Sequence, residues 1–152
     1  MDQPRSTAQR KADVLEQLRM VAGTEKDIWV ASASASGEAY LIPVSFYWDG
    51  ARLTVATPKR SRTARNLQRA GAARMALEPT RDVVILEGTL EFIETDADDE
   101  LAAAHTEAAG FDARRSGKNV YIQLTPQKIQ AWRTTEELVG RDVMIDGRWL
   151  TS

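Results

Sequence analysis

Residues 39–57 carry the pattern that most restricts the fold, a β-hairpin whose first strand is apolar on both faces. From Tyr40 to Trp48 every second residue is large and apolar, and most residues between them are apolar as well. The Asp49-Gly50 pair that follows is a strong signal for a two-residue turn, and the next residues alternate again. Since both faces of the first strand are largely apolar, we expect both to be covered.

The same criteria divide the rest of the chain into short elements separated by turn signals. We predict helices at residues 7–22, from about Ser61, and at 96–109, and strands at 27–36, 73–78, 82–93, 120–125 and 128–134. We expect Pro126 to separate the last two strands, Gly88 to mark a bulge or a tight bend, and residues 143–150 to form a small hairpin around Asp146-Gly147. Residues 1–6 are expected to be loose.

This arrangement predicts a mostly β (α+β) fold. Short hairpins, few helices and the lack of a regular βαβ alternation favour a six- to seven-stranded antiparallel barrel with flanking helices over a doubly wound dinucleotide-binding fold. A chain of 152 residues can build one full hydrophobic core. We therefore expect a single domain over residues 1–152, with the barrel at residues 27–134.

Composition excludes several classes of protein. The chain has no cysteine, so it forms no disulfide, thiolate nucleophile or cysteine-based metal site, and a reducing compartment such as the cytoplasm is expected. It has no apolar run near the ~20 residues of a membrane-spanning helix, and its polar start does not resemble a secretory signal. The net charge of −2 gives no general affinity for nucleic acid.

Against this background the segment from Gly50 to Leu77 is strongly basic. It has no acidic residue and contains Lys59, Arg60, Arg62, Arg65, Arg69 and Arg74. A helix that begins near Ser61 would place Arg62, Arg65 and Arg69 on one face, where like charges repel unless an anion lies between them. A phosphate at the helix N-terminus would also meet free N–H groups and the hydroxyls of Ser61 and Thr63. The alternative is a solvated basic helix with no ligand.

The sequence offers no catalytic constellation. His105, the single histidine, is expected on a surface helix, and no triad or paired-carboxylate motif accompanies it. The acidic residues 96–100 are explained as partners of a helix dipole. We therefore predict no catalytic side chain and no metal site.

The order of strand, Asp-Gly hairpin, strand, Thr57 and then Ser61-Arg62-Thr63-Ala64-Arg65-Asn66-Leu67 resembles the pyridoxamine 5′-phosphate oxidase-like split-barrel superfamily. It is most similar to the flavin/deazaflavin-dependent oxidoreductase branch, over residues 27–93 and more weakly over 121–132. Ser61, Arg62, Arg65 and Leu67 match the phosphate signature of that family. Thr63 stands where the family often has lysine, so a hydroxyl replaces one cation.

The resemblance implies a homodimeric split barrel with two flavin-type cofactors at the interface. The residues expected to hold the phosphate side of the cofactor are Thr57, Lys59, Arg60, Ser61, Arg62, Thr63 and Arg65. Those expected to lie against the ring are Pro43, Val44, Ser45 and Phe46, for which ordinary strand packing is the alternative. Trp132 and Trp149 are expected to close the ring pocket from the partner subunit.

The activity implied is hydride transfer from reduced coenzyme F420 to a small conjugated or heteroaromatic substrate, with Lys59 or Arg60 meeting the carboxylates of the polyglutamate tail. One alternative is an FMN-binding protein of the pyridoxamine phosphate oxidase type. Another is a non-catalytic module that binds flavin, haem or a tetrapyrrole, and a third is an anion-binding or nucleic-acid-binding surface. Our expectation is a small-molecule enzyme without nucleic-acid or membrane partners.

Overall fold

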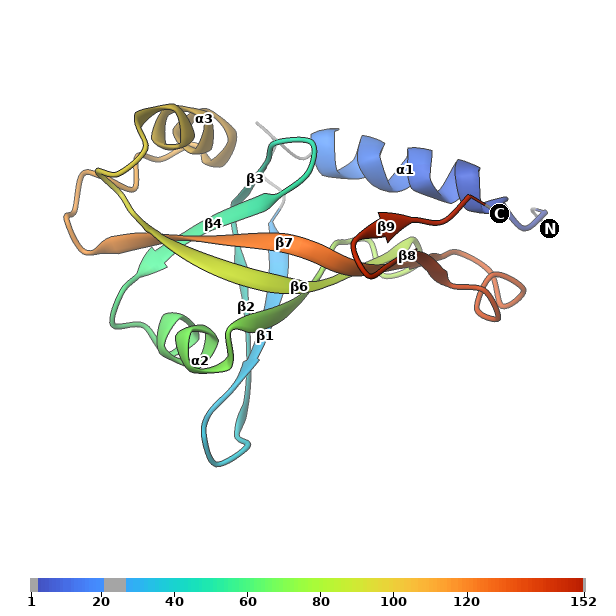
Figure 1. Ribbon diagram of the computed structural model, residues 1–152, viewed down its shortest axis with the longest axis horizontal. Helices are drawn as coiled ribbons and strands as arrows, with labels where there is room; N and C mark the ends of the chain where they lie inside the picture. Colours follow the sequence, from blue (N-terminus) through green and yellow to red (C-terminus); the bar gives the residue numbers. More distant parts are fainter. Residues whose placement is uncertain (1–2, 21–26, 152) are drawn as a thin grey trace.

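The computed structural model describes residues 3–20 and 27–151, and within them it contains three helices and nine strands (Figure 1). The helices are α1 (Thr7–Met20), α2 (Arg62–Ala70) and α3 (Asp99–Ala109). The strands are β1 (Ile28–Ala33), β2 (Ala39–Val44), β3 (Phe46–Trp48), β4 (Leu53–Pro58), β5 (Ala72–Ala76), β6 (Val83–Glu94), β7 (Asn119–Trp132), β8 (Asp142–Ile145) and β9 (Arg148–Trp149). None of these helices is both long and apolar enough to cross a bilayer.

All strand pairs are antiparallel, and seven strands form a path in the order β2-β1-β5-β6-β7-β4-β3, to which β8 and β9 are added at β7. The expected strand at 39–48 is therefore two strands. They follow each other in the chain, yet β2 and β3 lie at opposite edges of the path, and the chain crosses between them at Ser45. The sheet is curved but not closed there, which confirms the antiparallel split-barrel fold.

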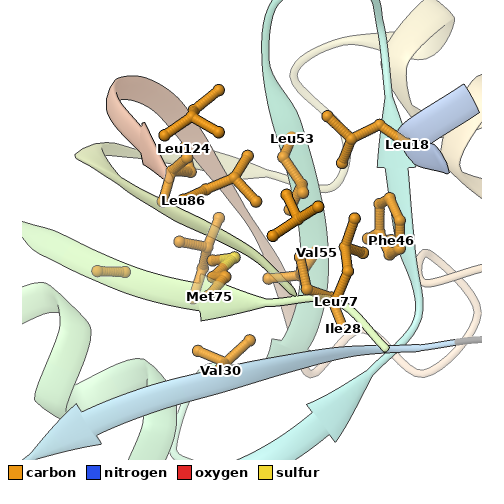
Figure 2. Close-up of a cluster of buried hydrophobic side chains, with 14 of the residues drawn as sticks. Leu18, Ile28, Val30, Phe46, Leu53, Val55, Met75, Leu77, Leu86 and Leu124 are labelled. Atoms are coloured by element: carbon orange, nitrogen blue, oxygen red, sulfur yellow. The ribbon is translucent and has the colours of Figure 1, made fainter. Parts of the chain in front are cut away.

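The main core fills the inside of this curved sheet (Figure 2). Leu18 of α1 covers one end, and Ile28, Leu53, Leu86 and Leu124 converge from four different strands. Each of these five side chains is fully buried, and burial of such a side chain contributes about 1.5–3 kcal/mol. A smaller second core lies between α3 and the outer face of the sheet. Both faces of the central strands are thus covered. The expectation that both faces of residues 39–48 are covered is wrong for β2 within the chain, because Ala39, Leu41 and Pro43 on one of its faces are exposed.

The predicted break at Pro126 is wrong, because β7 runs through this residue without interruption. Gly88 of β6 pairs with Pro126, and Glu87 pairs with Lys128, so Gln127 is an extra residue in β7. A bulge needs no ladder N–H at every position, and it therefore accepts a proline inside a strand. Of the bulge or tight bend that the sequence predicts at Gly88, the structure has the bulge.

The N-terminal segment is less loose than expected, because Arg5 is held by Glu137. The Arg5 backbone N–H and guanidinium donate to the Glu137 carboxylate at 2.7, 2.9 and 3.1 Å. Although burial alone would raise the pKa of Glu137, hydrogen bonds from Arg5 and from the Arg133 N–H lower it to about 2. The helix begins at Thr7 as predicted, but its expected end near residues 21–23 lies outside the described residues. Likewise, Met1 and Asp2 lie outside them.

Replacement of Gly88 by alanine is expected to destabilise the protein. A Cβ at this position would lie 2.1 Å from the Thr125 carbonyl oxygen and 3.0 Å from the Pro126 Cα, and these backbone atoms cannot move aside as a side chain can. We expect Gly88→Ala to lower the free energy of unfolding by about 1–3 kcal/mol or more in urea denaturation. The control is Gly140→Ala, which meets nothing within 4 Å. A Gly88→Ala protein as stable as the control would contradict this account of the bulge.

Candidate functional site

The loop between β4 and α2 builds a polar N-terminus for α2. Ser61 is the N-cap, and its Oγ accepts a hydrogen bond from the Ala64 N–H at 3.1 Å. Thr57 lies at the end of β4, and its Oγ1 is 3.1 Å from the same Ser61 oxygen. The helix therefore begins where the sequence predicts. By helix geometry the N–H groups of Arg62 and Thr63 have no acceptor within α2, so they are available to an anion.

These groups fit a phosphate. When Thr57 donates its hydrogen to Ser61, the Ser61 oxygen accepts from both Thr57 and Ala64 and keeps its own hydrogen for a further acceptor. That hydrogen and the two free N–H groups lie at the positive end of the α2 dipole. The loop therefore offers only donors and positive charge at this point, and these are the groups that bind phosphate oxygens.

Most of the cations around this N-terminus are not neutralised. In residues 3–20 and 27–151, Arg60, Arg62 and Arg65 form no ion pair, and all three are exposed. Lys59 pairs with Glu94 at 2.5 Å, whereas Arg69 donates to the Ala33 carbonyl and so points away from the N-terminus. The structure thus keeps Arg62 and Arg65 as candidate phosphate ligands, whereas Arg69 is engaged by the β1–β2 hairpin.

The hydroxyl of Thr63 does not occupy the place expected for it. Thr63 is only 2% exposed, and its Oγ1 is buried with no hydrogen-bond partner in the described chain. A buried oxygen cannot act as the solvent-facing donor that replaces the family's lysine. Thr63 can therefore contribute its backbone N–H to an anion, while its side chain packs inside.

A basic pocket of about 450 Å³ adjoins the same loop. It is lined by Pro58, Lys59, Arg60, Gly117 and Lys118, with no carboxylate. The Lys59 N–H donates to the Lys118 carbonyl at 2.8 Å, so the connection between α3 and β7 lies directly beside the α2 N-terminus. Sequence reasoning missed Lys118, because only the pairing of β4 with β7 brings it to Lys59.

The four residues expected to lie against the ring stand where the chain crosses from β2 to β3. Pro43 is exposed, Val44 is half-buried, and the Ser45 hydroxyl donates to Asp27 at 3.1 Å. Phe46 is only 2% exposed and pairs with Val55 of β4, so its side chain belongs to the core. A flat ligand at the crossing can meet Pro43 and the backbone of this segment, but not the Phe46 ring.

Trp132 is far from the α2 N-terminus within one chain. Thr57 pairs with Val120 near one end of β7, and Trp132 ends the strand twelve residues later. At about 3.3 Å per residue this is roughly 40 Å of strand. The half-buried Trp132 instead lies beside Arg141, whose guanidinium carbon is 5.9 Å from the centre of the ring. Within a single chain, Trp132 is therefore not brought together with the other candidate residues.

Comparison with known proteins identifies the family of the chain. Residues 14–133 match the model of the family described as pyridoxamine 5′-phosphate oxidase. The chain belongs to this family. No curated protein matches the sequence. The family includes oxidoreductases that use flavin-type cofactors.

Several solved structures share the fold. An F420 reductase is 16% identical with a TM-score of 0.57, covering 73% of this chain and 94% of its own. A putative pyridoxamine 5′-phosphate oxidase from Lactobacillus delbrueckii is 17% identical with a TM-score of 0.55, covering 75% and 89%. A haem-binding protein from Mycobacterium smegmatis is 20% identical with a TM-score of 0.61, covering 88% and 57%. At these identities the similarity establishes the fold and does not assign one cofactor.

The single histidine of this family member is not on the surface, contrary to the expectation from sequence. His105 of α3 is fully buried, and its ring lies 5.2 Å from the Tyr121 ring and 5.5 Å from the Phe111 ring. Burial lowers the pKa of His105 from 6.5 to about 4, an effect that the charge of Asp112 opposes only in part. The sequence did not reveal this packing, because α3 is short and rich in alanine and so has only a weak periodic pattern of apolar residues. His105 is a core residue of the second cluster and has no access to a substrate.

Mild acid is therefore expected to destabilise the protein through His105. Between pH 6.5 and about 4 the unfolded chain takes up a proton that the folded chain does not, so the stability present above pH 6.5 falls as pH is lowered. The full effect is about 3 kcal/mol, and denaturant unfolding between pH 7 and pH 4.5 should show most of it. In His105→Gln the decrease should be smaller by this amount. An equal decrease in both proteins would contradict the assignment.

Proposed function

We propose that this protein is a reductase that uses coenzyme F420, with the cofactor phosphate at the N-terminus of α2. The observation that supports F420 in particular is the pocket beside that N-terminus, where Arg60 and Lys118 form no ion pair within the described residues, although Lys59 is paired with Glu94. F420 carries a polyglutamate tail beyond its phosphate, whereas FMN ends at the phosphate. A second group of cations next to a phosphate site fits the longer, more anionic cofactor.

In this proposal the protein holds the phosphate through backbone, hydroxyl and guanidinium groups together. Arg62 and Arg65 supply charge, Ser61 and Thr57 supply hydroxyls, and the first N–H groups of α2 point toward the anion. A charge-assisted hydrogen bond contributes about 1.5–3 kcal/mol, which exceeds the 0.2–0.5 kcal/mol repulsion of a like-charged pair on a helix. Binding of the anion thus turns an unfavourable cluster of arginines into a favourable one.

The ring would lie at the crossing between β2 and β3, where Pro43 is exposed and the sheet is open. This position leaves one side of the ring uncovered by the same chain. We propose that a second copy of the chain covers it in a homodimer and that Trp132 and Trp149 of the second copy supply the cover. Within one chain, three strands separate β2 from β7, the strand that ends at Trp132.

Bound and reduced, the cofactor would supply a hydride from the C5 edge of its ring to a small conjugated or heteroaromatic substrate. The chain itself would fix the phosphate and the tail at α2, set the ring against the backbone of residues 43–46, and exclude water from the open edge of the sheet. No catalytic side chain is needed for these tasks, in agreement with the absence of a catalytic motif in the sequence.

FMN is the alternative cofactor, because the α2 N-terminus suits any phosphate. A haem protein with a histidine or cysteine ligand is disfavoured, since the chain has no cysteine and its one histidine, in α3, is fully buried. Fluorescence titrations of the cofactor-free protein with F420 and with FMN test the proposal. Tighter binding of F420 would support the proposal. Tighter binding of FMN would show that FMN is the cofactor, and binding of neither would overturn the proposal.

Substitution of Arg62 or Arg65 by alanine is expected to weaken cofactor binding without unfolding the domain. Loss of one charge-assisted hydrogen bond corresponds to a roughly 10- to 100-fold increase in Kd. Both side chains are exposed, so circular dichroism and the thermal midpoint should stay near those of the parent. Arg19→Ala is the matched control, because Arg19 is an exposed arginine on α1 that pairs with Glu16. Equal affinities in all four proteins would rule out the α2 phosphate site.

Substitution of Lys118 by alanine separates the tail pocket from the phosphate site. Lys118 lines the basic pocket but belongs to a different loop from the phosphate-binding residues. The affinity for F420 should fall about 2- to 5-fold, as for the loss of an exposed ion pair, while the affinity for FMN should not change. An equal effect on both cofactors would place Lys118 at the phosphate instead of the tail.

A further inference from the structure

Helix α2 is attached to the β1–β2 hairpin by three polar contacts along one of its faces. The Arg62 guanidinium carbon lies 5.0 Å from the centre of the Tyr40 ring, the Asn66 amide donates to the Ser32 hydroxyl at 3.1 Å, and Arg69 donates to the Ala33 carbonyl. Residues 62, 66 and 69 follow the spacing of neighbours on a helix face. Figure 1 shows the hairpin extending beyond the sheet beside α2. The small residues at 31–36 thus allow α2 of the same chain to pack closely against the hairpin.

Of these three contacts, the one at Tyr40 lies closest to the candidate phosphate site. Arg62 is the first residue of α2, and Tyr40 stands on β2 directly opposite Ser32 of β1. Tyr40 is half-buried, so its ring is held by the hairpin while one side remains open to the guanidinium. The hairpin therefore fixes the position of an arginine whose long side chain would otherwise take many rotamers.

The nature of this contact matters for anion binding. Arg74 and Lys59 are paired with Glu87 and Glu94, and such carboxylates neutralise the cation they hold. Arg62 has no ion pair within the described part of the chain, and the Tyr40 ring attracts it through the π face. An aromatic ring can orient a guanidinium without removing its charge, and it forms no N–H···O bond that would compete with a phosphate.

We propose that Tyr40 is a positioning residue that holds Arg62 ready for the cofactor phosphate. This inference rests on the proposed function, because it concerns the same phosphate site. A guanidinium already fixed in its bound position loses less freedom on binding, so the contribution to affinity is larger than for a mobile arginine. Tyr40 therefore favours phosphate-bearing ligands and makes no difference to ligands that carry the ring system alone.

The test compares Tyr40→Leu, Tyr40→Phe and Arg62→Ala in the full-length protein, each titrated with the cofactor that binds and with its phosphate-free nucleoside. These pairs are F420 with the deazaflavin nucleoside, or FMN with riboflavin. We expect Tyr40→Leu to weaken cofactor binding about 3- to 10-fold, within the range of a partly desolvated cation–π contact, and to leave nucleoside binding unchanged. Tyr40→Phe keeps the ring and should restore the parent affinity.

Two further variants distinguish positioning from a general structural role. In the Arg62→Ala background, Tyr40→Leu should cause no additional loss, because Tyr40 acts through Arg62. Ser32→Ala removes the next contact between the hairpin and α2 without touching Arg62, and it should leave cofactor affinity unchanged. A full additional loss in the Arg62→Ala background, or equal losses for cofactor and nucleoside, would overturn the proposal.

The outcomes also separate this inference from the proposed function. If the parent protein binds neither F420 nor FMN, the proposed function fails, and the role of Tyr40 fails with it. If the parent protein binds a cofactor and Tyr40→Leu binds it equally well, only the role of Tyr40 is overturned. Circular dichroism of each variant confirms that the comparison is made between folded proteins.

Discussion

The strand β7 is the constraint on which the rest of the structure depends. It pairs with β6 along twelve positions and with β4 along six, and so it joins the two halves of the sheet that end at the open edges β2 and β3. The bulge at Gly88 and Pro126 lets so long a strand bend with β6 while most of the ladder is kept. The pairing of this strand with β4 is what places the loop before α2 beside the loop before β7.

The candidate site follows from that pairing. The pairing of Pro58 with Asn119 brings the end of β4 beside the start of β7, and the Lys59 N–H then meets the Lys118 carbonyl. Basic residues from two separate loops thereby lie beside one helix N-terminus, where unpaired N–H groups already favour an anion. The charge of this surface is therefore a product of sheet topology as well as of composition.

Local signals in the sequence were sufficient where the structure depends on neighbours in the chain. The Asp146-Gly147 turn, the start of α2 next to Ser61 and the start of α1 are all found where the sequence predicts them. The same signals failed where a distant segment decides the outcome. Pro126 does not end a strand because Gly88 of β6 faces it, and His105 is buried because Phe111 and Tyr121 pack around it. The hydroxyl of Thr63 points inside for the same reason, since packing overrides the pattern of the helix.

By itself the sequence determined the mostly β antiparallel class, the position of the basic helix and the likeness to the pyridoxamine 5′-phosphate oxidase family, because periodicity, turn residues and charge are local properties. The tertiary structure alone decided which of the predicted residues share one place. It set Arg62 on Tyr40, joined Lys118 to Lys59, committed Phe46 to the core and separated Trp132 from α2 by most of a strand. These relations depend on strand register and on the crossing at Ser45. Both bring together segments that are far apart in the chain, so no local sequence pattern predicts them.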